Sequence, residues 1–168
     1  AYYVFYWLTL TFPSLVYFLG FSYLLTRFIR NQGISIIVLL VLLGGITLWG
    51  ADFGNGVFDP CARHVPNMFS DFTGHVNLGN YLLQRGGILL AGFGFLVLSI
   101  VPFRRIPNSL RVARQCVSGA VVLFVLAGGM ALFYLGRHDA IGNDRADYKA
   151  VYDKYVEQPK ARVIKNDL

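Results

Sequence analysis

The chain has 168 residues, of which 55% are apolar and only 14% are charged. Soluble domains usually carry about a quarter charged residues, so this composition argues against a soluble enzyme. The net charge of +6 comes from basic residues beside apolar runs, which is the pattern of membrane topology and not of a face that binds nucleic acid.

Four stretches lack Asp, Glu, Lys and Arg altogether, and apolar runs of about 18 residues without charge are typical of membrane spans. We predict an all-α integral membrane protein with four transmembrane helices, over about residues 3–28, 33–50, 86–103 and 115–136. Pro13 lies inside the first span, where a proline can kink a membrane helix. These spans make up a transmembrane region over the N-terminal four-fifths of the chain, residues 1–136.

The connections between the predicted spans differ in length. Arg30 to Gln32 is too short for anything except a tight turn, so the first two spans are expected to be antiparallel neighbours. Residues 51–85 form a long connection, in which Gly and Pro interrupt helices while apolar residues persist. This mixture predicts an amphipathic external connection of short helices on the membrane surface. In the third span, Gly87, Ala91 and Gly94 either allow close helix packing or reflect the general frequency of glycine in membrane helices.

The positive-inside rule predicts the orientation from the short loops. Six arginines belong to them: Arg27 and Arg30 in the first, and Arg104, Arg105, Arg111 and Arg114 in the second. Both loops fall on the same side of the predicted bundle, which is therefore expected to be cytoplasmic. The 51–85 connection and the tail would then face outward.

A short soluble tail, residues 137–168, follows the last predicted span and carries charges of both signs. Asn143 or Asp144 could cap a short helix that ends before Pro159. Tyrosines in that helix recur at four- and three-residue spacing and so share one face. We expect this extracytoplasmic tail to lead into a further domain after Leu168, and the chain to be a piece of a longer protein.

Few residues of the chain are candidates for catalysis or for metal binding. Cys61 and His64 have the spacing of metal ligands, and His75 lies further along the same connection, but no second closely spaced pair completes a site. Loop residues packed at the membrane surface are the favoured interpretation. No predicted span contains a buried ionisable residue, which argues against an ion-driven carrier. We therefore predict no catalytic, cofactor-binding or metal-binding residue in this chain.

Four short segments occur in a suggestive order: Leu24 to Ser35, Val57-Phe58-Asp59-Pro60, Asn80 to Gly86, and Phe103-Arg104-Arg105. Leu24 to Ser35 resembles the arginine-asparagine turn between the fourth and fifth membrane helices of ABC-2 type transporter permeases. Val57-Phe58-Asp59-Pro60 resembles the Asp-Pro element that follows the fifth helix. Asn80 to Gly86 resembles the entry to the sixth helix, and Phe103-Arg104-Arg105 resembles the basic exit of that helix. The tail, with Arg145-Ala146-Asp147-Tyr148, Tyr152, Tyr155, Pro159 and Arg162-Val163-Ile164, is similar to the lead-in of permeases fused to an outward-facing zinc aminopeptidase-like domain.

The resemblance implies the C-terminal membrane half of a permease in an ATP-driven exporter of the bacterial inner membrane. Its partners would be the lipid bilayer, a second permease copy in a homodimer or heterodimer, and a separate ATPase subunit. Arg27, Arg30 and Asn31 would shape a cytoplasmic turn near that subunit, and residues 57–85 would form external gate helices. The alternative, from a different class, is a non-transporting membrane anchor or assembly subunit of a larger complex. A membrane enzyme using Cys61 is the least favoured reading.

Overall fold

A computed structural model of the protein describes residues 2–29, 31–49, 56–57, 59–62, 69–70, 74–75, 77–101 and 110–156. Three of its helical segments, Val4–Ile29, Leu78–Ile100 and Leu110–Lys154, are long and apolar enough to cross a membrane by length and composition. A shorter apolar helix covers Gln32–Ile46. The prediction of a helical fold with membrane-span-like helices is confirmed, whereas the number of four spans stays a prediction.

The first long helical segment contains a turn of π-helix. It consists of α1 (Tyr2–Tyr6), the π-helical element η1 (Trp7–Thr11) and α2 (Phe12–Ile29). Pro13 has no N–H to donate to the carbonyl of Thr9, and its ring would press on that carbonyl in a regular α-helix. The wider π-helical turn directly before the ring relieves this conflict, with the Phe12 N–H bonded to the carbonyl of Trp7. The helical path therefore continues through the proline.

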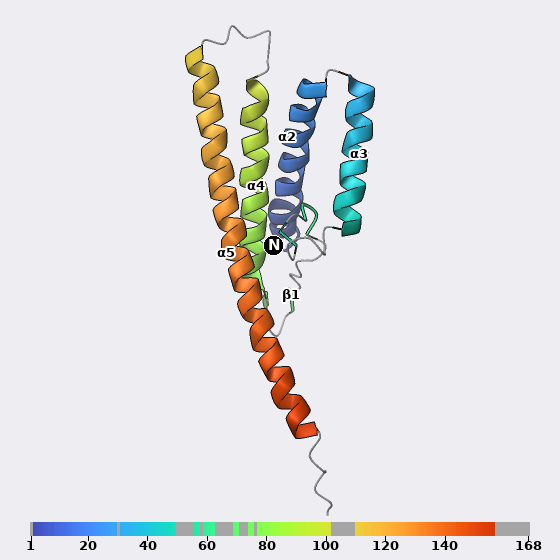
Figure 1. The fold of residues 1–168 in the computed structure, drawn as a ribbon, viewed down its shortest axis with the longest axis vertical. Helices are drawn as coiled ribbons and strands as arrows, with labels where there is room; N and C mark the ends of the chain where they lie inside the picture. Colours follow the sequence, from blue (N-terminus) through green and yellow to red (C-terminus); the bar gives the residue numbers. More distant parts are fainter. Residues whose placement is uncertain are drawn as a thin grey trace, which may run out of the picture.

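Helix α3 (Gln32–Trp49) begins at a tight turn and runs antiparallel to α2 (Figure 1). The Asn31 side chain caps it, because Oδ1 accepts hydrogen bonds from the amides of Gly33 at 3.0 Å and Ile34 at 3.5 Å. Among the side chains described in α3, Ser35 alone is buried. The apolar surface of α3 is thus left for lipid or for other helices.

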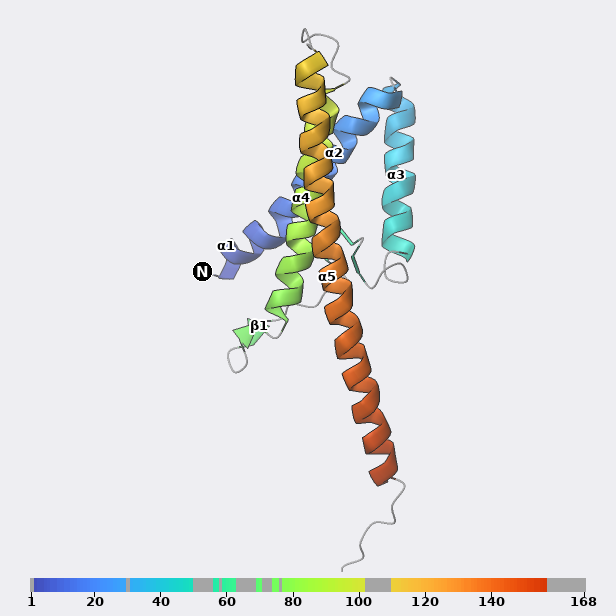
Figure 2. The same ribbon diagram turned by 60° about the vertical axis from the view of Figure 1, so that its left-hand side comes forward.

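Helix α4 (Leu78–Ile100) lies between α2 and α5 (Leu110–Val156), as Figure 1 shows. In Figure 2 the α1–η1–α2 segment crosses α4 obliquely. At the crossing, a Cβ on Gly20 would collide with the carbonyl of Gly92, and a Cβ on Gly92 would lie 2.7 Å from the backbone nitrogen of Tyr17. Only glycine at these two positions allows such an approach of the backbones.

Two of the three small residues expected to promote close packing in this helix face α5. A Cβ on Gly87 would lie 3.6 Å from the carbonyl of Ala127, and one on Gly94 would lie 3.0 Å from the ring of Phe124. Both therefore face α5 at ordinary or tight contact distance. The closest approach of two backbones is instead at Gly92, against α2.

The 51–85 connection differs from its prediction in its described part. Residues 56–62 contain turns, and β1 (Phe69–Ser70) pairs antiparallel with β2 (Gly74–His75) as two-residue strands. Of the described residues from 56 to 75, none is in a helix. The helix that contains the predicted third span begins at Leu78 and not at Gly86, so the last part of the predicted connection belongs to α4.

Helix α5 is continuous over 47 residues, a length of about 70 Å, and extends well past the ends of the other helices (Figures 1 and 2). The expected new helix start at Asn143 or Asp144 is wrong, because the helix runs through both. The sequence from 110 to 156 contains no proline, and single glycines such as Gly136 weaken a helix without ending it. The predicted fourth span and the predicted tail helix are therefore one continuous helix.

The glycine crossing gives a direct test. Replacing Gly92 with Ala should lower the free energy of unfolding by about 1–3 kcal/mol, because the new methyl group meets the backbone of α2. The same change at Gly129, where a Cβ meets nothing within 4 Å, should leave stability unchanged or slightly raised. Thermal unfolding in detergent, followed by circular dichroism, measures both. Equal midpoints for the two variants would contradict the crossing.

Candidate functional site

A group of buried polar side chains lies at the start of α4 and the turn that precedes it. Asn80, Gln84 and Arg85 come from the first turns of α4, and Asp59 comes from the turn at residues 56–62. Each is at most 4% exposed. Asn80 and Gln84 share a helix face because they are four residues apart. We call these four residues the α4 polar cluster.

Arg85 joins three parts of the chain. Its Nη1 donates to the carbonyl of Pro60 at 2.7 Å and to the Ser14 hydroxyl at 3.2 Å, and its Nη2 donates to the carbonyl of Asp59 at 3.0 Å. Ser14 in turn donates to the carbonyl of Pro60 at 2.6 Å. The guanidinium also lies 6.0 Å from the centre of the Tyr81 ring. Arg85 thereby ties α4, α2 and the turn together.

Gln84 holds the same turn from a second side. Its Nε2 donates to the carbonyls of Gly56 at 3.0 Å and of Asp59 at 2.7 Å. The Asp59 carboxylate accepts the amide of Cys61 at 3.1 Å, which closes the turn locally. The backbone carbonyls of Gly56, Asp59 and Pro60 therefore point at α4. This arrangement explains why polar side chains are tolerated in a buried helix face.

Three buried polar atoms of the described chain have no hydrogen-bond partner: Oδ1 of Asn80, Oε1 of Gln84 and Nε of Arg85. All belong to the α4 polar cluster. Buried polar atoms are paired in the great majority of cases, so an unpaired group in a native protein calls for an explanation. The cluster therefore holds the turn against α4 and still contains three buried polar atoms without a hydrogen-bond partner.

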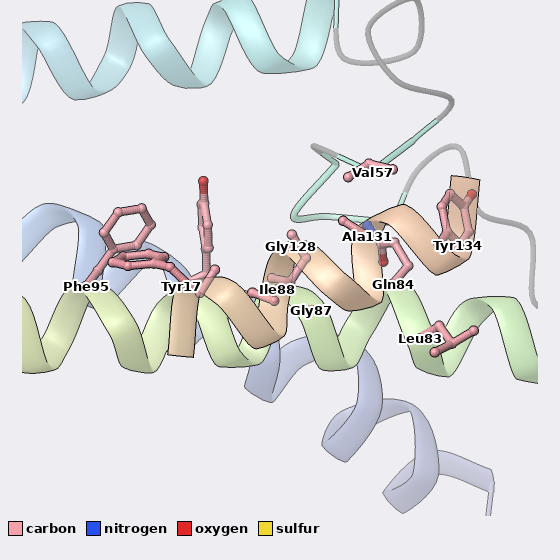
Figure 3. A pocket seen from close by; sticks show the side chains of 13 residues that line it. Tyr17, Val57, Leu83, Gln84, Gly87, Ile88, Phe95, Gly128, Ala131 and Tyr134 are labelled. Atoms are coloured by element: carbon pink, nitrogen blue, oxygen red, sulfur yellow. The ribbon is translucent and has the colours of Figure 1, made fainter. Parts of the chain in front are cut away.

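A pocket of about 310 Å³ adjoins the cluster between α2, α4 and α5. Its walls are mainly apolar, with Ile88 and Ala127 among them. Figure 3 shows Gln84 and Tyr134 at one end and Tyr17 with Phe95 at the other. At the aromatic end, the rings make edge-to-face contacts from Tyr17 to Phe95 at 5.6 Å and from Phe95 to Phe124 at 5.0 Å between ring centroids.

The basic residues singled out in the sequence lie apart from this pocket. Arg27 is exposed at the C-terminal end of α2, and Arg111 and Arg114 are exposed at the N-terminal end of α5. These two helix ends lie at the same end of the bundle (Figure 1). Asn31 serves as the cap of α3. The remaining predicted arginines, Arg30, Arg104 and Arg105, lie outside the described residues.

Metal chemistry finds no support within the described ranges. No group of three or more His, Cys, Asp or Glu side chains there could hold a metal ion. Cys61 is exposed, and His64 lies outside the described residues.

The expectation that no span contains a buried ionisable residue is wrong. It depended on starting the third span at Gly86, whereas α4 begins at Leu78 and contains Arg85 at 2% exposure. The polar residues at 80 and 84, with apolar Tyr81 and Ile88 one heptad apart, form a helical pattern that could have indicated the earlier start.

Comparisons with known proteins do not extend these observations: no protein-family model, no curated protein and no solved structure matches the chain.

Arg85 is the residue on which the cluster depends most. Replacing it with Met removes its hydrogen bonds to the turn and to Ser14, and removes a positive charge near the buried Asp59. We expect the free energy of unfolding to fall by about 1–3 kcal/mol. Replacing the exposed Arg114 with Met provides the matched control and should change little. Chemical unfolding in mild detergent measures both, and a neutral R85M would contradict the assigned role.

Proposed function

We propose that this chain is the C-terminal membrane portion of the permease of an ATP-driven ABC-2 type exporter. One observation supports this above the others. The Asp59-Pro60 element and the segment Asn80 to Gly86, which each resemble permease segments on their own, contact each other through Gln84 and Arg85. Two segments that each resemble a permease segment, and that also contact each other, support the proposal more strongly than two segments that lie apart.

The charge distribution supports the same proposal. The Arg27 end of α2 and the arginine-bearing start of α5 lie together at one end of the bundle (Figure 1). Under the positive-inside rule this end is cytoplasmic. The α2–α3 turn would then lie where a separate ATPase subunit binds, and residues 57–85 would form the external gate region. The membrane would be the bacterial inner membrane, with the C-terminal part of α5 outside the cytoplasm.

Exposed apolar helix surfaces support a larger assembly within the bilayer. On α3, large side chains at four neighbouring positions, Ile36, Ile37, Leu40 and Val41, are each at least 60% exposed. On α5, Val125 and Leu132 are similarly exposed. A homodimeric or heterodimeric permease would cover part of these surfaces and leave the remainder to lipid.

A second candidate, a non-transporting membrane anchor, is favoured by α5. Its 47 residues run without interruption from the apolar bundle into a charged, exposed C-terminal part. Such a helix suits a stalk that holds an external domain at a fixed distance from the membrane. The two candidates differ in one respect that can be measured: only the exporter binds an ATP-hydrolysing subunit.

The test is capture of the affinity-tagged natural protein from its own membranes in mild detergent, followed by assay of ATP hydrolysis in the captured material. We expect ATPase activity to co-purify. Arg27→Glu should lower the captured activity about tenfold or more, because reversal of charge at an interface weakens binding strongly. Lys149→Glu, at the opposite end of α5, is the matched control and should have no effect.

Absence of ATPase activity in the captured wild-type material, with the protein itself recovered intact, would contradict the exporter and leave the anchor. Equal loss in both charge-reversal variants would contradict the cytoplasmic assignment of the α2–α3 turn.

A further inference from the structure

We propose that the exposed face of α5 at the arginine end of the bundle binds an anionic phospholipid. The phosphate of the head group lies on Arg111 and Arg114, and an acyl chain lies on the apolar side chains that follow them along the helix. The proposal concerns binding alone. It requires only that α5 crosses a membrane, so it applies to the exporter and to the anchor, and its test is independent of the proposed function.

One row of α5 side chains is exposed along most of the apolar part of the helix. Arg114 is followed in this row by Val121, Val125 and Leu132, which are 53%, 67% and 72% exposed. Because these residues are spaced by seven, four and seven positions, they share one helix face. Arg111, one turn before Arg114, is exposed as well. The row therefore begins with two cationic side chains and continues with apolar ones.

This row lies outside the contacts that α5 makes within the described chain. The buried side chains of α5 recur every seven residues, at Ala120, Ala127 and Tyr134, on a different side of the helix that packs against α4. Helix α4 is the main neighbour of α5 among the described elements, and α5 lies at the opposite edge of the bundle from α3 (Figure 1). In a bilayer, the row is left to lipid or to another chain.

The distances along α5 fit one leaflet of a membrane. Arg114 and Val125 are eleven residues apart in one helix, which is about 17 Å at about 1.5 Å per residue. Half of a hydrocarbon core of about 30 Å is about 15 Å. Residues 115–136 carry no charged side chain, so Arg114 marks the border between the charged and the apolar parts of α5. A phosphate at this border has its acyl chains at the depth of Val121 and Val125.

The charge at this end of the molecule favours an anionic head group. Arg111 and Arg114 form no ion pair within the described part of the chain, and the sequence from 72 to 138 contains no Asp or Glu. A guanidinium group is planar and can bind two phosphate oxygens at once. An anionic lipid therefore neutralises the two arginines, whereas a zwitterionic lipid brings a positive charge of its own.

A second copy of the chain fits this face less well. Most oligomers are closed by a two-fold axis, which sets the same surface of both chains face to face. Arg111 and Arg114 of two copies would then lie close together, and like charges at an interface are strongly unfavourable. The sequence of α3 from Gln32 to Trp49 contains no charged residue, so its exposed surface suits a protein partner better. The exposed row of α5 is therefore left to lipid.

The experiment uses the full chain in phosphatidylcholine bilayers with a trace of a photoreactive lipid. Two probes are compared, phosphatidylglycerol and phosphatidylcholine with identical chains and a mid-chain diazirine. After irradiation, labelled peptides that cover 117–126 are quantified by mass spectrometry. We expect the phosphatidylglycerol probe to label this segment about five- to thirtyfold more than the phosphatidylcholine probe at equal concentration, which is the effect of one or two arginines close to an anionic group.

Two double variants of the same helix provide a matched comparison. Arg111→Gln with Arg114→Gln removes two charges from the site and should lower the ratio of the two labels by about fivefold or more. Lys149→Gln with Lys154→Gln removes two charges from the far end of α5 and should leave the ratio unchanged. Labelling of α3 is the internal reference for correct folding and should stay the same in both. An excess of glycerol phosphate, a soluble analogue of the head group, should not reduce the labelling of the wild type.

Several outcomes would overturn the proposal. Equal labelling of 117–126 by the two probes in the wild type would do so whatever the variants show, and an equal loss in both double variants would indicate general attraction to a basic protein. Suppression by glycerol phosphate would indicate a site for free phosphate. Labelling of α3 without labelling of 117–126 would indicate that a protein partner covers this face. None of these results changes the outcome of the ATPase capture that tests the exporter.

Discussion

A charged side chain buried in an apolar helix bundle has few stable positions, and Arg85 is such a side chain. Arg85 is 2% exposed, and the two terminal nitrogens of its guanidinium donate to the carbonyls of Asp59 and Pro60 and to Ser14. In a low-dielectric environment an unpaired guanidinium is strongly disfavoured, so these partners must stay in place. The position of the turn at residues 56–62, and with it one end of the apolar pocket, follows from this requirement.

The other end of the pocket depends on how closely α2 approaches α4. Gly20 and Gly92 bring the two backbones together, and the π-helical turn before Pro13 lets the same helix continue toward its N-terminus. Tyr17, next to the crossing, is thereby placed against Phe95. The contacts of Arg85 fix one end of the pocket, and the crossing of α2 and α4 at Gly20 and Gly92 fixes the other. The small side chains of α5 leave the space between these two ends unfilled.

Sequence patterns predicted the elements whose signal is local. Runs without charge indicated the apolar helices, and the short Arg30–Gln32 link indicated an antiparallel pair. The start of α4 was missed because Asn80, Gln84 and Arg85 are polar, and polar residues beside glycine indicate a loop when their partners are unknown. Those partners are main-chain carbonyls, which any residue supplies, so no sequence pattern marks them. The unpaired Oε1 of Gln84 and the pocket beside it depend on the same tertiary contacts.

The continuity of α5 has a mechanical consequence. A helix resists bending far more than a loop does, so a rotation or tilt imposed at Leu110 reaches Val156 with little loss. Over a length of about 70 Å, even a tilt of a few degrees displaces the far end by several ångströms. The wall of the pocket formed by Ala127 to Tyr134 lies on this lever. A shift of this wall against α4 would therefore tilt the C-terminal part of α5.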